Sequence, residues 1–116
     1  MKRTDGVTEG IEMTLEKVPG IQYAFIYGSF AENPEDHERA VDILVLGGPE
    51  LVEMDEVISK AEGKIGRSFL TTSFTIRELR ERIKLKDETI LTALKGAKTM
   101  LIGDEKEMEA ALGAQG

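Results

Sequence analysis

The sequence predicts an α/β (α+β) fold in which a mixed sheet of about four strands is flanked by helices. Short runs of β-branched and aromatic residues alternate along the chain with longer segments whose apolar residues recur at helical spacing. The 116 residues, 41% hydrophobic and 32% charged, have the size and composition of one globular unit. We therefore expect a single domain over residues 1–116, with residues 1–7 and 113–116 disordered at its ends.

The first half of the chain is expected to begin with a helix that leads into two strands. Thr8 can cap this helix, and Pro19-Gly20 ends it. Residues 21–27 are rich in β-branched and aromatic side chains, which indicates a short buried strand. Residues 40–46 are apolar at every position except Asp42, a pattern typical of a strand that is covered on both faces. A carboxylate in such a strand needs an explanation.

The second half is expected to alternate helices with two more strands. A stripe of apolar residues predicts a long helix over residues 51–65, and strand character returns at residues 67–74 and 99–102. Three further helices are expected, because each would begin at a residue that can cap it: Thr75, Asp87 and Asp104. The first and last of these caps are followed three residues later by a glutamate, which is the spacing of a capping box.

The net charge of −7 is unevenly distributed, because residues 60–98 carry an excess of basic side chains and the rest of the chain an excess of acidic ones. The basic segment could form a face toward a phosphate or an acidic partner, or it could be a solvated helix surface; it contains Arg77, Arg80, Arg82, Lys84 and Lys86. Few aromatic residues are available to stack on bases, and the chain is acidic overall. We do not expect nucleic acid to be the partner.

The sequence also bears on the compartment. It contains no cysteine, which excludes disulfides and thiolate metal sites. No leading apolar segment or membrane-length apolar run is present. The expectation is a cytoplasmic protein without a membrane association.

A glycine and a serine follow the first expected strand. Gly28 permits dihedral angles and a close backbone approach that a side chain would block, and the N–H and hydroxyl groups of Ser29 could then meet phosphate oxygens. Such a dipeptide alone is also common in ordinary turns. Gly28 and Ser29 are therefore either a phosphate-binding element or an ordinary turn.

Asp42 is the candidate metal ligand. Strand side chains alternate, so residues 40 and 42 should point to one face, where two acids would clamp a divalent cation. Position 40 is Ala40, so Asp42 could hold one magnesium ion only with help from a nucleotide. The alternative is a structural carboxylate that accepts backbone hydrogen bonds or pairs with an arginine. Acidic residues of the preceding loop could compensate, although loop carboxylates are normally solvated: Glu35, Asp36 and Glu38.

Residues 25–31, the ten-residue interval after Ser29 and residues 41–45 resemble the Gly-Ser, Asp-x-Asp signature of the nucleotidyltransferase superfamily that includes DNA polymerase β. They are most similar to its small, stand-alone prokaryotic members. Residues 100–105 also resemble the close of nucleotidyltransferase domains. The resemblance spans about residues 11–112 and implies a nucleotidyltransferase-like fold.

The resemblance also implies a site. In active relatives the Gly-Ser element holds a nucleoside triphosphate, and three carboxylates bind two magnesium ions. Gly28 and Ser29 match the phosphate element, and Asp42 matches the second carboxylate, which is catalytic. Ala40 replaces the first carboxylate, and residues 67–74, where the third is expected, contain no acid.

Two functions follow from this comparison. The first is a nucleotidyltransferase-fold domain with a degenerate site, non-catalytic or weakly active, that binds a nucleotide phosphate or a partner protein. Because similar stand-alone proteins are often paired with a helical HEPN-type toxin, this reading implies an antitoxin or adaptor. The alternative is an active enzyme that uses Mg2+ and a nucleoside triphosphate to transfer a nucleoside monophosphate to a protein or small acceptor.

Overall fold

The computed structural model describes residues 6–33 and 40–113. No helix in these two ranges is long and apolar enough to cross a membrane. The elements follow one another as α1 (Gly6–Glu16), β1 (Ile21–Tyr27), α2 (Ser29–Glu32), β2 (Val41–Gly47), α3 (Leu51–Ile65), β3 (Phe69–Phe74), α4 (Ile76–Lys84), α5 (Glu88–Lys95), β4 (Lys98–Ile102) and α6 (Glu105–Leu112).

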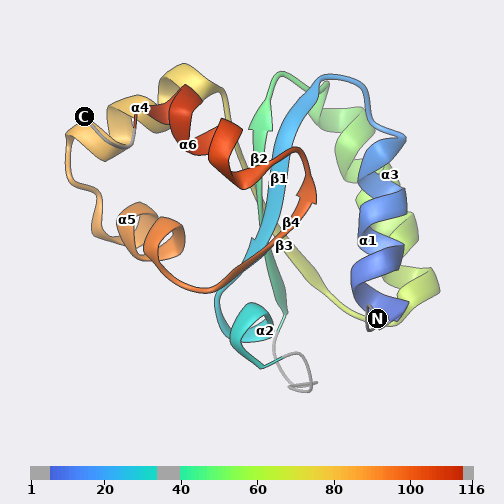
Figure 1. Ribbon diagram of the computed structural model, residues 1–116. Coiled ribbons are helices and arrows are strands. Elements are labelled where there is room, and N and C mark those ends of the chain that lie inside the picture. Colours follow the sequence, from blue (N-terminus) through green and yellow to red (C-terminus); the bar gives the residue numbers. More distant parts are fainter. Residues whose placement is uncertain (1–5, 34–39, 114–116) are drawn as a thin grey trace.

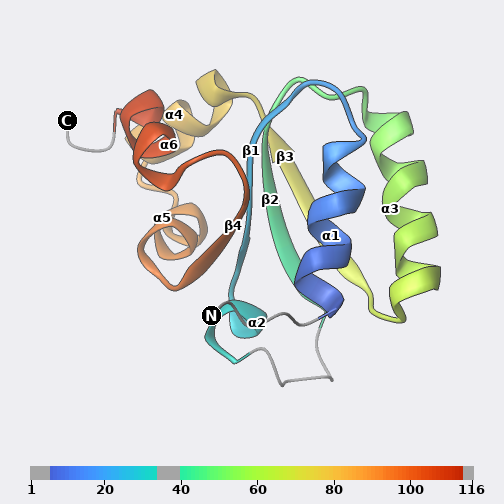
Figure 2. The same ribbon diagram turned by 45° about the vertical axis from the view of Figure 1, so that its right-hand side comes forward.

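The four strands form one mixed sheet with the order β3-β2-β1-β4. Strand β1 is antiparallel to both of its neighbours, whereas β2 and β3 run parallel and are connected through α3. Helices α1 and α3 lie on one face of the sheet, and α4, α5 and α6 lie on the other (Figures 1 and 2). The predicted α+β architecture, a mixed sheet of about four strands flanked by helices, is confirmed.

Strand β2 is buried on both faces, as its composition predicts. Val41, Ile43 and Val45 belong to the core cluster under α1 and α3. Leu44 and Leu46 belong to the second cluster, on the side of α4, α5 and α6. Because strand side chains alternate, Asp42 points to the same side as Leu44 and Leu46, where it is half-buried.

Local capping signals explain where several helices begin. Thr75 and Glu78 form the predicted capping box of α4. Asp104 accepts a hydrogen bond from the Glu107 N–H at the start of α6, but the return bond of a capping box is absent from the described contacts. Glu50, which the sequence did not identify as a cap, accepts hydrogen bonds from two N–H groups of α3.

Some expected boundaries were wrong by one or two residues. Helix α1 begins at Gly6, before the predicted cap, because Val7 already packs against the core. The Val41 N–H starts the pairing of β2 with β3 by donating to the Ser68 carbonyl, so Ala40 precedes the strand. Likewise β3 begins at Phe69 rather than at residue 67. Gly113 is an ordered left-handed C-cap of α6 with φ 70°, while residues 1–5 and 114–116 lie outside the described ranges.

Candidate functional site

The turn after β1 requires glycine. Gly28 has φ 76° and ψ −150°, in the left-handed half of the map that L-residues avoid. A Cβ atom placed on Gly28 would lie 2.7 Å from the Oδ2 atom of Asp42. The turn and the carboxylate, 14 positions apart in sequence, are therefore in direct proximity. Ser29 is the first residue of the short helix α2 and is half-buried.

Asp42 lies in the middle of a row of side chains that crosses the sheet. Its partner in β1 is Tyr27, and its partner in β3 is Leu70. Burial raises the pKa of the Asp42 carboxyl above its ordinary value. No arginine or lysine within residues 6–33 and 40–113 forms an ion pair with Asp42, and no backbone N–H beyond the sheet bonds its side chain. The structural alternative, an aspartate paired with arginine or bonded to backbone N–H groups, is not what these residues show.

Tyr27 is a neighbour of this carboxylate that the sequence analysis missed. Burial is the main cause that raises the pKa of its hydroxyl, and the charge of Asp42 raises it further. A side-chain hydrogen bond with Thr72 of β3 acts in the opposite direction. Tyr27 precedes Gly28 directly and alternates with Phe25 along β1, which was the available signal that it faces the same side as Asp42.

The donor set around Asp42 does not fit a pair of metal ions. Ala40 contributes no oxygen from its side chain, and β3 presents Leu70 and Thr72 on the Asp42 face instead of an acid. Among the residues that the structure describes, no three His, Asp, Glu or Cys side chains gather in a way that could hold a metal ion. The loop acids proposed to compensate lie outside the described ranges: Glu35, Asp36 and Glu38.

A cavity of about 450 Å³ opens beside the turn. Its wall is formed by the end of β1, the turn and short helix after it, and α5 with the two residues that follow it: Tyr27, Gly28, Glu32, Glu88, Thr89, Thr92, Ala93, Gly96 and Ala97. This volume lies in the range of small-molecule sites. Both charged residues of the lining are acidic, so the cavity favours an uncharged ring or sugar over a phosphate group.

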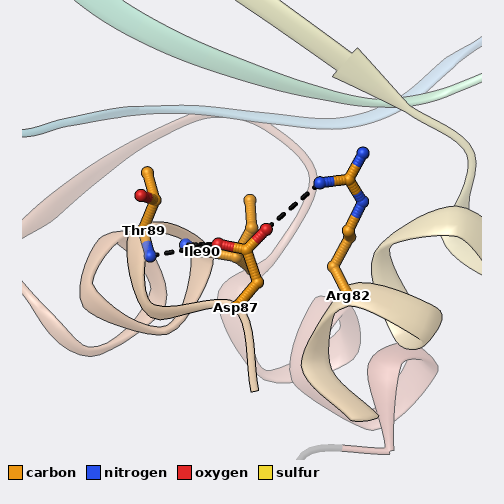
Figure 3. A network of polar contacts seen from close by, with 4 residues as sticks. All are labelled: Arg82, Asp87, Thr89 and Ile90. Atoms are coloured by element: carbon orange, nitrogen blue, oxygen red, sulfur yellow. Dashed lines mark hydrogen bonds and ion pairs between the residues drawn. The ribbon is translucent and has the colours of Figure 1, made fainter. Parts of the chain in front are cut away.

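Helix α5, which forms one wall of the cavity, is fixed at its start by Asp87. This carboxylate accepts hydrogen bonds from the N–H groups of Thr89 and Ile90 and forms an ion pair with Arg82, whose Nη1 atom lies 3.1 Å from Oδ2 (Figure 3). The Ile90 N–H and then the Arg82 guanidinium are the main causes that lower the pKa of Asp87. The predicted cap is confirmed.

The end of α5 is fixed by Lys98 at the start of β4. The Lys98 side chain is only 7% exposed. Its Nζ atom donates to the Leu94 carbonyl at 2.7 Å and to Glu105 Oε2 at 3.1 Å. One buried ammonium group thus connects the last turn of α5 to the first turn of α6. The cavity wall is held at both ends by charged groups.

No protein-family model matches the sequence, and no curated protein matches it. Similar solved structures do exist. A toxin–antitoxin with AMP-PNP is 14% identical, with a TM-score of 0.59 over 92% of this chain and 82% of that one. The tri-AMPylated HEPN toxin of Shewanella oneidensis in complex with the MNT antitoxin is 16% identical, with a TM-score of 0.55 over 90% and 76%. The MntA–HepT toxin–antitoxin is 13% identical, with a TM-score of 0.52 over 95% and 82%.

At these identities the likeness concerns the fold. It supports the nucleotidyltransferase-like fold that the Gly-Ser and Asp42 segments indicated. It does not assign a role to Gly28, Ser29 or Asp42, which remain candidates.

Proposed function

We propose that this protein is a non-catalytic, nucleotidyltransferase-fold binding protein of the antitoxin type, which binds a helical HEPN-type toxin in the cytoplasm and retains a nucleotide pocket. One observation carries the proposal. Asp42 lies against Gly28, where phosphate chemistry would occur, but no group of three potential metal ligands gathers among the described residues. The proposed phosphate site would then lack the oxygen ligands that two-metal catalysis needs.

Catalysis by two metal ions requires more oxygen ligands than Asp42 supplies. Two-metal phosphoryl transfer needs ions roughly 3.5–4 Å apart that stabilise the entering and leaving oxygens together. A single half-buried carboxylate cannot bridge and complete the shells of such a pair. The pKa of Asp42 is raised by burial, and no lysine or arginine in residues 6–33 and 40–113 forms an ion pair with this carboxylate. We therefore derive no step that passes through a magnesium ion.

Nucleotide binding is supported by the cavity between the turn and α5. Its volume of about 450 Å³ suits a nucleoside, and its acidic lining disfavours phosphates inside it. The phosphates would then lie outside the cavity, toward the backbone of Gly28 and Ser29. The similar toxin–antitoxin structure with AMP-PNP supports a nucleotide as the ligand.

Partner binding is supported by the similar structures, since all three are toxin–antitoxins and one of these toxins is a HEPN protein. The predicted basic face is smaller than the sequence suggests. Arg80 donates to the Ala111 carbonyl and Arg82 pairs with Asp87, so both act within the protein. The remaining basic residues are exposed and make no ion pair with a described residue: Arg77, Lys84 and Lys86.

The test is a titration of the 15N-labelled protein with AMP-PNP, with and without Mg2+, followed by calorimetry with HEPN-type toxins from the genome that encodes it. We expect amide shifts at Gly28, Ser29 and α5, and a toxin complex that survives Asp42→Asn. Asp55→Asn, an exposed site on α3, is the matched control. If no amide shifts at millimolar nucleotide, the nucleotide pocket is removed from the proposal. If no toxin forms a complex with the protein, the proposal is overturned.

The alternative, an active nucleotidyltransferase, is favoured by one observation: the Gly28–Asp42 proximity itself. Incubation with labelled ATP, GTP, CTP or UTP, magnesium and the toxin as acceptor distinguishes the two functions. The binding function predicts no label transfer. Transfer that disappears in Asp42→Asn and persists in Asp55→Asn would establish the enzyme instead.

A further inference from the structure

Strand β3 forms an open edge of the sheet, because the strand order places it outside β2. In a parallel ladder every second residue bonds the neighbouring strand. The Val41 N–H donates to the Ser68 carbonyl, which sets this alternation. The backbone N–H and C=O groups of Thr71 and Ser73 therefore point away from the sheet, and no other described segment bonds them through its backbone.

This edge carries almost none of the features that usually block further pairing. Natural edge strands are protected by lysines, prolines, bulges or a covering element. Strand β3 has the sequence FLTTSF, without a charge or a proline, and pairs with β2 without a register shift. One end of the edge is covered by Glu62, whose Oε2 atom accepts a hydrogen bond from the Phe69 N–H. The opposite edge, β4, contains Lys98 and a register shift.

The side chains on the edge add apolar surface. Leu70 is 61% exposed, which is a high value for a leucine inside a strand. It shares a face with Thr72 and Phe74, since strand side chains alternate. Figure 2 shows β3 as the outermost strand on the side of α3.

We propose that β3 pairs antiparallel with β3 of a second copy of this chain, about a twofold axis at Thr72. In this register Thr71 of each copy exchanges backbone hydrogen bonds with Ser73 of the other. Thr72 faces Thr72, and Leu70 faces Phe74, so the exposed leucine is covered by an aromatic ring. The edge is complementary to itself, and its lack of charge avoids local repulsion between two chains of net charge −7.

The pairing extends the row of side chains that contains Asp42. Along one face the order becomes Tyr27, Asp42, Leu70 and then Phe74 of the second copy. Arg82 stacks over Phe74, with its Cζ atom 5.4 Å from the ring centroid. The second copy thus brings an aromatic ring and a guanidinium to the outer side of the carboxylate row. This inference stands on the sheet edge and not on the proposed function.

Cysteine crosslinking tests the register directly, because the natural chain contains no cysteine. Residues at a non-hydrogen-bonded antiparallel pair have Cα atoms about 4.5 Å apart, within the roughly 4.4–6.8 Å range of disulfides. We expect Thr72→Cys to form a disulfide-linked dimer under mild oxidation. Leu70→Cys, whose copies would lie four residues apart in register, should not crosslink. Thr99→Cys, exposed on β4, is the control for the opposite edge.

Sedimentation equilibrium over a concentration series tests the contact without crosslinks. Thr72→Lys places two like charges on the axis and should abolish the dimer, whereas Thr99→Lys on β4 should leave it unchanged. Thr71→Pro removes an outward donor without removing a bond to β2, and should weaken the dimer about tenfold. Thermal unfolding of each variant verifies that it folds.

Three results would overturn the proposal. The natural chain could remain monomeric at millimolar concentration, Thr72→Cys could crosslink no faster than Thr99→Cys, or the dimer could survive Thr72→Lys. A monomer whose toxin binding is lost in Thr72→Lys would assign the edge to the toxin interface and reject the second copy.

Discussion

A Cβ atom on Gly28 would stand 2.7 Å from Asp42 Oδ2, so the turn and the carboxylate can occupy their present positions only while residue 28 is glycine. The positive φ of 76° imposes the same restriction through the backbone. Two independent constraints act on one residue, and both involve the candidate site. They can be separated by mutation.

Gly28→Ala should lower the free energy of unfolding by about 1–3 kcal/mol, because alanine meets both a strained φ and the Asp42 oxygen. Chemical denaturation measures this. Gly63→Ala, in α3 with open space around its Cβ position, is the matched control and should be stabilising by about 0.5–1 kcal/mol. In the double variant Gly28→Ala, Asp42→Ala the contact is gone and part of the loss should return. Full additivity would show that the two residues do not interact.

Asp42→Asn should raise stability at neutral pH and leave it unchanged at acidic pH. The folded-state pKa of Asp42 lies above its ordinary value, so the native state binds the proton more tightly than the unfolded chain. The cost of burying the charged form is absent below the unfolded pKa and develops as pH rises through the folded pKa. Thermal unfolding of both proteins from pH 3 to pH 7 measures the difference. A gain of equal size across this range would contradict the role of the charge.

Asp87 should respond to pH in the opposite direction. Its pKa is lowered in the folded state, so its contribution is present above the unfolded pKa and is lost as pH falls through the folded pKa. Asp87→Ala should therefore destabilise the protein at neutral pH and have little effect once the carboxyl is protonated. Asp87→Asn keeps a good cap and loses only the ion pair with Arg82, so its effect should be smaller. Equal effects of the two variants would assign the stability to the ion pair.

Ala40→Asp, which adds the acid that the resemblance implies at this position, should increase the affinity for divalent cations, because residue 40 lies two positions before Asp42. Paramagnetic broadening of the Asp42 amide by Mn2+ measures this, and we expect the broadening at about tenfold lower Mn2+ than in the natural chain. Ser59→Asp, which adds the same charge on exposed α3, is the control. Identical broadening in both variants would mean that residue 40 does not face Asp42.

Structural features that depend on neighbouring residues in the sequence were predictable. Features that depend on how distant strands pair were not. The capping box at Thr75 and the doubly covered strand β2 follow from spacing and composition, and both are observed. The start of β2 depends on where Ser68 of a later strand offers its carbonyl, so Ala40 was wrongly placed inside the strand. No local sequence pattern indicates that the side chain of Tyr27 in β1 interacts with Thr72 in β3.

The candidate site also has one part that the sequence predicted and one part that it did not. The Gly28 and Asp42 pair was suggested by spacing, and the structure brings the two residues together. The cavity wall supplied by α5 was not predicted, because nothing in residues 88–97 indicates what the helix packs beside. The burial of the Lys98 side chain was also not predictable, since a lysine at the start of a strand is normally exposed to solvent.

Strand β2 is anchored by apolar side chains in both core clusters, and Asp42 contributes to neither of them. The core residues and the candidate site residue are therefore different side chains of the same seven-residue strand. Exchanging the carboxylate therefore leaves every apolar anchor of the strand intact, so the sheet tolerates chemical variation at this position.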